Sequence, residues 1–286
     1  KVIISGGGRC NVTTGIVDLS IVLTKYPRGA KFLTSAMHQF PPRAVYDWFE
    51  AQRVPLKNQA DDRVFPVSND GHDVVHVFEK LFRKTSVKVM LETTVDAIAK
   101  VDEGFSITLR HHPEPLVVDK VILTTGGQAY RQTGSTGDGY AFATALGHTI
   151  TPLAPSLNSF TTLEKWPSQV SGLSFSKVKI TALRNKKPNF TGPILFTHQG
   201  VSGPAVFALS SLVAFEKYDQ KQPMNITIDL FPDISLEDLK IDFEKKMKLN
   251  AKKKLANALD IFLPKSLADE LGVIVEISDA KNAGDL

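Results

Sequence analysis

The stretch Val2-Ile3-Ile4-Ser5-Gly6-Gly7-Gly8-Arg9-Cys10-Asn11 decides the fold class of this 286-residue chain. Its apolar, β-branched start is typical of a buried strand, and the glycines that follow permit backbone conformations that other residues rarely adopt. A strand that ends in such a loop predicts a place where the backbone comes close to a ligand. We therefore expect a strand over residues 2–5 and a ligand contact in the loop that follows it.

A second glycine loop follows a second apolar run. Residues 116–123, which are apolar except for Asp119 and Lys120, are predicted to form a strand of the kind that is buried inside a sheet, and the segment ends at Thr124-Thr125-Gly126-Gly127. The glycine-rich residues 134–139 then lead into a helix predicted over residues 140–146 and closed by Gly147. Such loops suit a pyrophosphate, which needs close backbone approach and oriented N–H donors. Each loop alone is also compatible with an ordinary turn, and the dinucleotide pattern G-x-G-x-x-G does not occur in the chain.

The rest of the chain predicts an α/β part, then a β-rich part, then a helical part. Two amphipathic helices split by Pro41-Pro42 are expected over residues 29–53, a hairpin over 54–67, and a helix over 70–81 with Asn69 or Asp70 as its cap. Further strands are predicted at residues 87–91, 94–100 and 105–110. Alternating segments at 178–183, 194–197 and 225–230 indicate the β-rich part, and residues 236–271 predict two helices divided near Asn250 and Pro264.

Composition and charge argue against several classes of protein. Lysine and arginine exceed aspartate and glutamate by 34 − 30 = 4, and this mild excess does not indicate a nucleic-acid binder. The densest basic run, residues 245–254, has helical spacing, which favours a solvated helix face over a phosphate-binding patch. No apolar stretch reaches the roughly 18 residues of a membrane helix, and the start of the chain lacks the core of a signal peptide. Cys10 is the only cysteine, which indicates a reducing, cytoplasmic setting.

Four motifs in register resemble one family. They are Ser5-Gly-Gly-Gly-Arg-Cys-Asn-Val-Thr, Thr124-Thr-Gly-Gly-Gln, Thr133-Gly-Ser-Thr-Gly-Asp-Gly-Tyr and Leu195-Phe-Thr-His-Gln-Gly-Val-Ser-Gly-Pro-Ala. The chain thereby resembles the aminoacetone oxidase-like, NAD(P)/FAD-dependent flavoprotein family, which includes bile-acid dehydroxylation flavoproteins. The resemblance runs over nearly the whole chain, and several long motifs are far more specific than a single glycine pattern.

The resemblance implies an α/β fold, in which a Rossmann-like FAD-binding domain is interrupted by a β-barrel-like domain and a small helical domain. We predict the incomplete Rossmann-like domain over residues 1–150, the inserted β-rich domain over 151–232 and the helical domain over 233–286. The family pattern begins with a G-x-G-x-x-G loop and ends with a further FAD segment. Because neither is found here, we expect the chain to be a fragment.

The resemblance also implies the cofactor-binding residues and the function. The expected FAD contacts are Ser5, Gly6, Gly7, Gly8, Arg9, Cys10, Asn11, Val95, Thr125, Gly126 and Gly127. The expected activity is hydride transfer between the flavin and a small organic substrate or NAD(P)H, with no nucleic-acid or membrane partner. The alternative is a truncated or degenerate homologue that keeps the fold without redox activity.

Several of these residues leave two interpretations open. Arg9 either supplies positive charge near a reduced flavin or forms a structural ion pair, and Val95 either meets the adenine or only joins a sheet ladder. His198 is a candidate proton-transfer group or a structural histidine. Cys10 is expected to be a buried packing residue, because a redox pair needs a second cysteine.

Two further expectations concern a cap and a metal. Asp138 is expected to cap the helix that begins at Gly139 or Tyr140. His72 and His76 have i, i+4 spacing, but no third ligand is spaced to complete a metal site, so no metal is expected.

Overall fold

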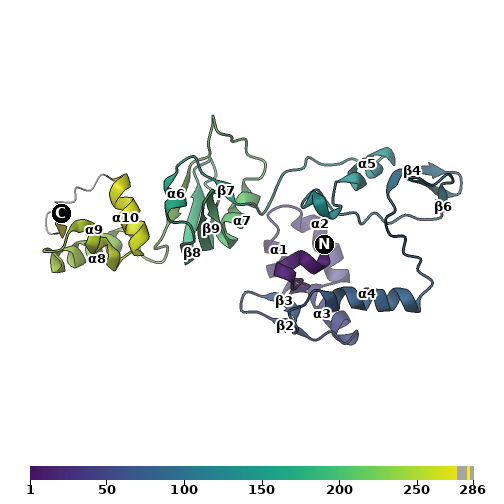
Figure 1. Ribbon diagram of the computed structural model, residues 1–286, viewed down its shortest axis with the longest axis horizontal. Helices are drawn as coiled ribbons and strands as arrows, with labels where there is room; N and C mark the ends of the chain where they lie inside the picture. Colours follow the sequence, from purple (N-terminus) through teal and green to yellow (C-terminus); the bar gives the residue numbers. More distant parts are fainter. Residues whose placement is uncertain (276–281, 284–286) are drawn as a thin grey trace. The chain divides into compact units, whose positions relative to one another are not determined.

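The computed structural model describes residues 1–275 and 282–283, which form two compact units, Lys1–Pro152 and Leu153–Leu286. Figure 1 traces the chain through both. The second unit holds both the β-rich part and the helices that follow it. The division of this unit near residue 232 therefore stays a prediction, and residues 276–281 and 284–286 of the predicted helical domain lie outside the described residues.

The first unit contains short helices and two small sheets. The sheets have the orders β1-β3-β2 and β4-β5-β6, and all their ladders are antiparallel. The helices are η1 (Val2–Gly8), α1 (Leu19–Thr24), α2 (Ala30–Gln39), α3 (Pro42–Ala51), α4 (His72–Lys84), η2 (Arg131–Thr133) and α5 (Asp138–Ala145). The strands are β1 (Thr13–Thr14), β2 (Leu56–Asn58), β3 (Arg63–Pro66), β4 (Val95–Val101), β5 (Gly104–Leu109) and β6 (Leu116–Val118).

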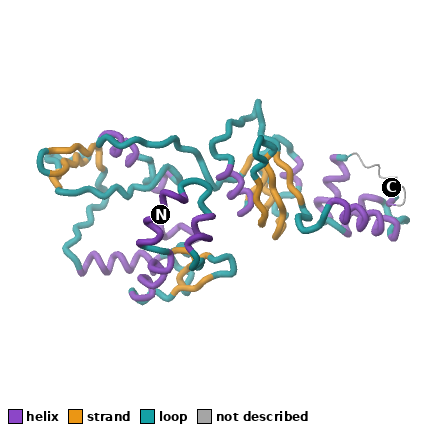
Figure 2. The backbone as a smooth tube through the Cα atoms, turned by 180° about the vertical axis from the view of Figure 1, so that it is seen from behind, coloured by secondary structure: helices purple, strands orange, loops and turns teal. Residues whose placement is uncertain are grey.

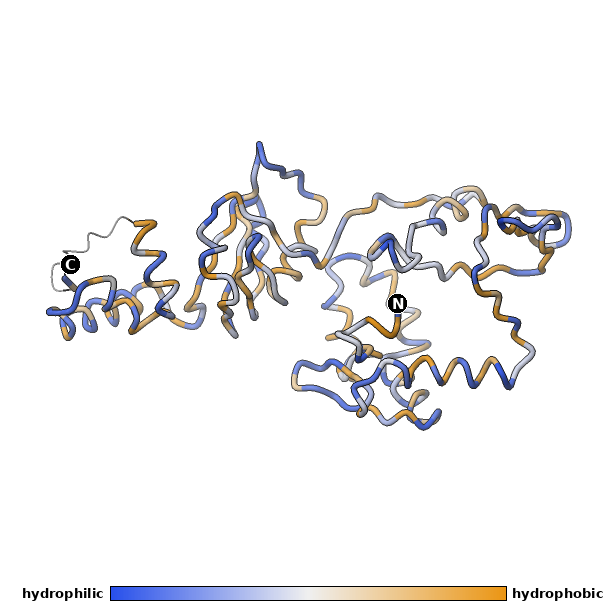
Figure 3. The backbone as a smooth tube through the Cα atoms, in the orientation of Figure 1, coloured by the Kyte–Doolittle hydropathy of each residue, from blue (hydrophilic) through white to orange (hydrophobic). Residues whose placement is uncertain are grey.

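The expected helix pair, hairpin and helix of this unit are confirmed. The cap expected at Asn69 or Asp70 is wrong, because the N-cap residue of α4 is Gly71, which has no side chain to accept a hydrogen bond. Pro41 has an extended backbone and Pro42 opens α3, so the two prolines end one helix and start the next. Helix α4 alternates hydrophobic and hydrophilic residues, which Figure 3 shows as orange and blue, and it buries Val74 and Val77. These side chains pack with residues of α3 and the β2-β3 hairpin into one core, namely Cys10, Phe49, Val54, Leu56, Val64, Val74 and Val77.

Three predicted strands of the first unit are wrong. Residues 2–5 lie in the 3-10 segment η1, with Ile4 60% exposed, and residues 87–91 form no regular element. The run over 116–123 is a strand only as far as Val118, and Ile122 is 86% exposed. A β-branched run becomes a strand only where a neighbour completes its hydrogen bonds. Within the described residues no strand pairs with residues 2–5, 87–91 or 119–123, and no ladder is parallel.

The second unit is built on one antiparallel sheet with the strand order β11-β8-β9-β10-β7, drawn in orange in Figure 2. The predicted strands at 178–183, 194–197 and 225–230 are confirmed as parts of it. Its strands are β7 (Phe160–Thr161), β8 (Ser174–Ala182), β9 (Asn189–Thr197), β10 (Gly200–Ser202) and β11 (Ile226–Asp229). The helices of the unit are α6 (Trp166–Gln169), α7 (Pro204–Leu212), α8 (Leu236–Leu249), α9 (Leu255–Ala258), η3 (Leu259–Ile261) and α10 (Lys265–Ile274).

The core of this unit lies between the sheet and α7. Alternate residues of β8, namely Val178, Ile180 and Ala182, are fully buried. They pack with Ala205, Val206 and Leu209 of α7, which are also fully buried, in one hydrophobic cluster. Helix α7 is apolar on most of its surface, and no side chain caps its start at Gly203. The helix is therefore stabilised by its packing against the sheet.

The helical segment that follows the sheet is interrupted near Asn250 and Pro264, as predicted. Ser235 caps α8 by accepting a hydrogen bond from the Asp238 N–H at 3.1 Å, and the helix ends at Asn250. Pro264 precedes α10, while the predicted second helix is divided further into α9, η3 and α10. No helix in the described part of the chain is both long and apolar enough to span a membrane.

We expect Ile180→Ala to lower the free energy of unfolding of the second unit by about 2–5 kcal/mol, because the change leaves a cavity in a fully buried site. Lys179→Ala, at the neighbouring exposed position of β8, is the control and should stay within about 0.5 kcal/mol of wild type. Urea unfolding measures both, and equal losses would contradict the placement of this core.

Candidate functional site

The glycine loop has a left-handed backbone through three consecutive residues. The φ angles are +57° at Gly6, +71° at Gly7 and +87° at Gly8. A Cβ atom at Gly6 would lie 3.0 Å from the Asn11 nitrogen and 3.1 Å from Phe65 Cε1, whereas one at Gly7 would have no heavy atom within 4 Å. Gly6 therefore packs against the protein, and Gly7 presents bare backbone to open space.

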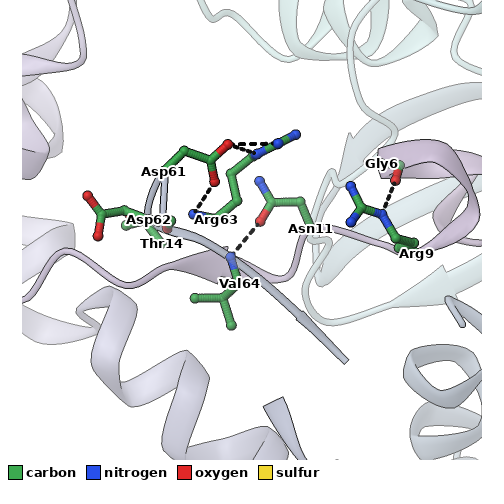
Figure 4. Close-up of polar contacts among 8 residues, drawn as sticks. All are labelled: Gly6, Arg9, Asn11, Thr14, Asp61, Asp62, Arg63 and Val64. Carbon is green, nitrogen blue, oxygen red and sulfur yellow. Dashed lines mark hydrogen bonds and ion pairs between the residues drawn. The ribbon is translucent and has the colours of Figure 1, made fainter. Parts of the chain in front are cut away.

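Hydrogen bonds fix this loop to strand β3. The Cys10 N–H donates to the Ser5 carbonyl at 3.0 Å, which closes the loop on itself. The Asn11 side-chain oxygen accepts from the Val64 N–H at 3.2 Å, as Figure 4 shows, and the Val12 N–H donates to the Val64 carbonyl at 2.9 Å. The position of the bare backbone at Gly7 is thus set by β3.

Arg9 lies over an aromatic ring and forms no ion pair in the described part of the chain. Its guanidinium carbon is 4.0 Å from the centre of the Phe65 ring, and its Nε donates to the Gly6 carbonyl at 3.3 Å. Arg63 approaches the same ring at 5.6 Å, but its charge is paired with Asp61 at 2.7 Å. The structure therefore shows a ring contact for Arg9 and, within the described residues, no structural ion pair.

The start of helix α4 is attached to the same loop, and no sequence pattern predicted this contact. The Gly71 N–H donates to the Gly8 carbonyl at 2.8 Å, and a Cβ atom at Gly71 would lie only 3.0 Å from that oxygen. Asp70 Oδ1 accepts from the His72 backbone N–H at 2.8 Å and lies 2.7 Å from His72 Nδ1. The backbone bond from His72, and then its side-chain bond, hold the pKa of Asp70 below its usual value.

Cys10 is buried, at 8% exposure, among the apolar residues of the first core. This environment fits the packing role expected for it. His72 and His76 lie near each other, with ring centres 6.2 Å apart, but the described residues contain no group of three potential metal ligands.

The second glycine loop packs against the start of helix α5. A Cβ atom at Gly139 would crowd Thr125 Oγ1, so a larger residue there would displace the Thr125 side chain. Gly126 has a φ of +77° and faces Ser135, whose side chain is buried at 7% exposure and accepts from Lys1 Nζ at 2.5 Å. Ser135 thereby links the second loop to the residue that precedes η1, a role that sequence reasoning missed.

The expected cap at Asp138 is wrong. Asp138 is the first residue of α5, and the N-cap is Gly137, which has a φ of +92° and no side chain to accept a hydrogen bond. The left-handed turn at Gly137 starts the helix one residue earlier than a capping aspartate would.

The structure does not join the remaining predicted site residues to the glycine loop. Val95 pairs with Leu109 at an irregular point of the β4-β5 ladder, which is the sheet role considered for it. His198 is exposed in the two-residue turn between β9 and β10, in the second unit. The described site therefore consists of residues 5–11 with β3 and the start of α4, linked by Lys1 and Ser135 to residues 125–139.

These features satisfy two requirements of a dinucleotide cofactor. Gly7 and Gly8 have left-handed backbones. A Cβ atom at Gly7 would have no heavy atom within 4 Å, and the nearest to one at Gly8 would be the Ile3 carbonyl oxygen at 3.9 Å, so a flat group can approach both residues closely. Arg9 supplies a positive charge for an anion beside that backbone. The residues present thus fit an FAD molecule along this loop.

Comparison with protein families shows which family the chain belongs to. Residues 1–210 match the family described as "HI0933-like protein Rossmann domain". The chain belongs to the HI0933-like family. Residues 154–286 match a second description, "HI0933-like protein barrel and H2TH domain". The family resemblance and the expected fold class, a Rossmann-like part followed by barrel-like and helical parts, are confirmed.

Three characterised relatives are similar to nearly the whole chain. A 3-dehydro-bile acid delta(4,6)-reductase from Clostridium scindens is 28% identical over 245 residues, covering 85% of this chain and 58% of the relative. Ribosomal RNA dihydrouridine synthases from Escherichia coli and Haemophilus influenzae are 26% and 28% identical, covering 98% and 96% of this chain and 66% of each relative. The chain thus spans about 58–66% of the length of these relatives.

We expect Gly6→Ala to lower the free energy of unfolding of the first unit by about 1–3 kcal/mol more than Gly7→Ala does. Both changes put a side chain on a left-handed backbone, but only the alanine at Gly6 crowds Asn11 and Phe65. Thermal unfolding of the two variants tests this, and equal losses would mean that Gly6 is not packed as described.

We expect the Asp70 carboxylate to stabilise the start of α4 in a pH-dependent way. Its pKa is lower in the folded state than in the unfolded chain, so its contribution is complete above the unfolded value of about 3.9 and is lost as the pH falls through the folded value. The Asp70→Ala variant should therefore have a lower free energy of unfolding than wild type above about pH 4, and this difference should become smaller as the pH falls below about 4. Urea unfolding at several pH values measures the difference. A deficit that does not change with pH would refute the role of the charge.

Proposed function

We propose that this chain is part of an FAD-dependent oxidoreductase that reduces a carbon–carbon double bond conjugated to a carbonyl group. The observation that carries the proposal is the bare, left-handed backbone at Gly7 beside Arg9, whose charge no carboxylate of the described residues neutralises. A dinucleotide needs both close backbone approach and positive charge.

The names of the relatives support the reaction class. One is a delta(4,6)-reductase of a 3-dehydro-bile acid, and two are synthases of dihydrouridine in ribosomal RNA. A 3-keto steroid with a neighbouring double bond and the uracil ring both contain a C=C bond conjugated to a C=O group. In each case reduction adds a hydride to the carbon far from the carbonyl and a proton to the nearer one, so one arrangement of groups serves both substrates.

The residues of the two glycine loops have the positioning roles in this proposal. Ser5, Gly6, Gly7, Gly8, Arg9, Cys10 and Asn11 form the surface along which the cofactor lies, with Asn11 fixing the loop to β3. Thr125, Gly126 and Gly127 form the second surface, and the Val95 backbone is proposed to meet the adenine. FAD, when bound, supplies the hydride.

The electron donor and the proton donor belong to the proposal as well. We place NAD(P)H as the donor that reduces the flavin, following the family resemblance. His198 remains the candidate proton-transfer group in the second unit. His72 is a rival in the first unit, because Asp70 orients its ring directly after Gly71, which is bonded to the glycine loop.

We expect Gly7→Ala to weaken FAD binding roughly tenfold or more, equivalent to about 1.4 kcal/mol, because its methyl group occupies the space that the cofactor approaches. Gly29→Ala is the matched control, since Gly29 also has a left-handed backbone, with φ +82°, and no atom within 4 Å. Flavin titration of protein expressed from the complete gene measures both affinities.

Equal affinities of the two variants would remove Gly7 from the flavin site. A wild-type protein that stays colourless after added FAD would refute the oxidoreductase and support the alternative of a homologue that keeps the fold without redox activity. Visible absorption spectra, taken before and after reduction by NAD(P)H, distinguish these outcomes.

A further inference from the structure

The turn between helices α8 and α9 carries a concentrated positive charge. Residues 245–254 contain six lysines and no acidic residue. The helical segment 236–275 as a whole is nearly balanced, with eight lysines against seven aspartates and glutamates. The charge is therefore segregated, and the small net charge of the chain conceals it.

Packing places these lysines on the outside of the helices. Met247 of α8 is buried with Leu255 and Ala258, and Phe243 and Phe262 cover this small core. Lys246 belongs to that side, because it is paired with Asp242 at 2.8 Å and lies 4.5 Å from the centre of the Phe262 ring. The other lysines are exposed and form no ion pair within residues 1–275 and 282–283: Lys245, Lys248, Lys252, Lys253 and Lys254.

A role limited to helix stability does not account for this set. Lysines in the last turn of a helix interact favourably with its dipole, and Lys246 and Lys248 occupy those positions in α8. The effect falls off within one turn. Lys252, Lys253 and Lys254 follow the end of α8 at Leu249 and lie at the start of α9, where the dipole disfavours positive charge.

A membrane surface also fits this segment poorly. A helix that lies on a lipid surface needs a broad apolar face beside its basic one. Three large apolar residues of α8 are strongly exposed, namely Leu236, Ile241 and Leu249. Their spacings of five and eight residues do not place them on one continuous face, while Phe243 and Met247 face the core. The surface is dominated by charge, which is the feature of a site for a phosphate backbone.

We infer that residues 245–254 bind the phosphate backbone of RNA. This inference rests on the proposed function. It narrows the substrate of the reductase to the conjugated double bond of a pyrimidine base in an RNA chain. The lysines hold the polymer through contacts that do not depend on base sequence, and the reducing site acts on the base. The earlier expectation of a solvated helix face is revised because Lys252, Lys253 and Lys254 lie in the turn after α8 and not on a helix face.

The test is the affinity of the complete protein for a fluorescent 20-nucleotide uridine-containing RNA, measured by anisotropy from about 50 to 200 mM salt. The patch variant replaces Lys248, Lys252, Lys253 and Lys254 by glutamine. The control variant makes the same change in net charge at exposed lysines of other loops in the second unit, namely Lys186, Lys187, Lys217 and Lys221. Thermal unfolding and FAD content are measured on both variants.

We expect the patch variant to bind RNA at least tenfold more weakly, with a salt slope smaller by about three, since each lost contact to a single strand removes about 0.7. The control variant should stay within about twofold of wild type. Equal weakening of both variants, or wild-type binding by the patch variant, would overturn the inference, as would binding of the patch to anionic vesicles but not to RNA. Flavin reduction by NAD(P)H in both variants tests the proposed function separately, because no lysine of the patch lies in the flavin site.

Discussion

The connection between the glycine loop and strand β3 is the constraint on which the candidate site depends. One side-chain oxygen of Asn11 accepts the Val64 N–H, and the loop that precedes it closes through Ser5 and Cys10. Because Gly6 packs against Phe65 and Gly7 does not pack at all, the same left-handed turn fixes the loop and leaves its backbone open. Arg9, held over Phe65, then adds charge beside that opening.

The proposal assigns cofactor binding to the first unit and RNA binding to the second. The first contains both glycine loops, and the second has a core of its own between the sheet and α7. The second unit also carries the concentrated lysines, on a helical segment whose overall charge is nearly neutral. The proposal assigns the cofactor to the unit that lies in the Rossmann match and the RNA to the unit that lies in the barrel and H2TH match.

Local patterns predicted the elements whose partners are near in sequence. The helix break at Pro41 and Pro42, the β2-β3 hairpin, α4 and the strands β8, β9 and β11 formed where expected, whereas β7 and β10 were not predicted. The runs at 2–5 and 119–123 did not form strands, because a buried strand is specified by neighbours that a periodicity does not reveal.

Among the site residues, the motifs indicated the two glycine loops but not their links. The bond from Gly71 to Gly8 and the contact of Lys1 with Ser135 join residues more than sixty positions apart, and no local pattern encodes such pairs. The net charge of the chain does not reveal the concentration of lysines at residues 245–254, since it averages them with acidic residues elsewhere on the same helices.

The central claim is that the protein passes a hydride to a double bond conjugated to a carbonyl group. Its most direct measurement is made without oxygen, on the complete protein with its flavin reduced by NAD(P)H. An α,β-unsaturated ketone or a uridine-containing RNA is then added while the flavin absorbance is followed. The account predicts that the oxidised flavin spectrum returns with one of them and that the product has gained two hydrogens. A flavin that stays reduced with both, and is reoxidised only by oxygen, would contradict it.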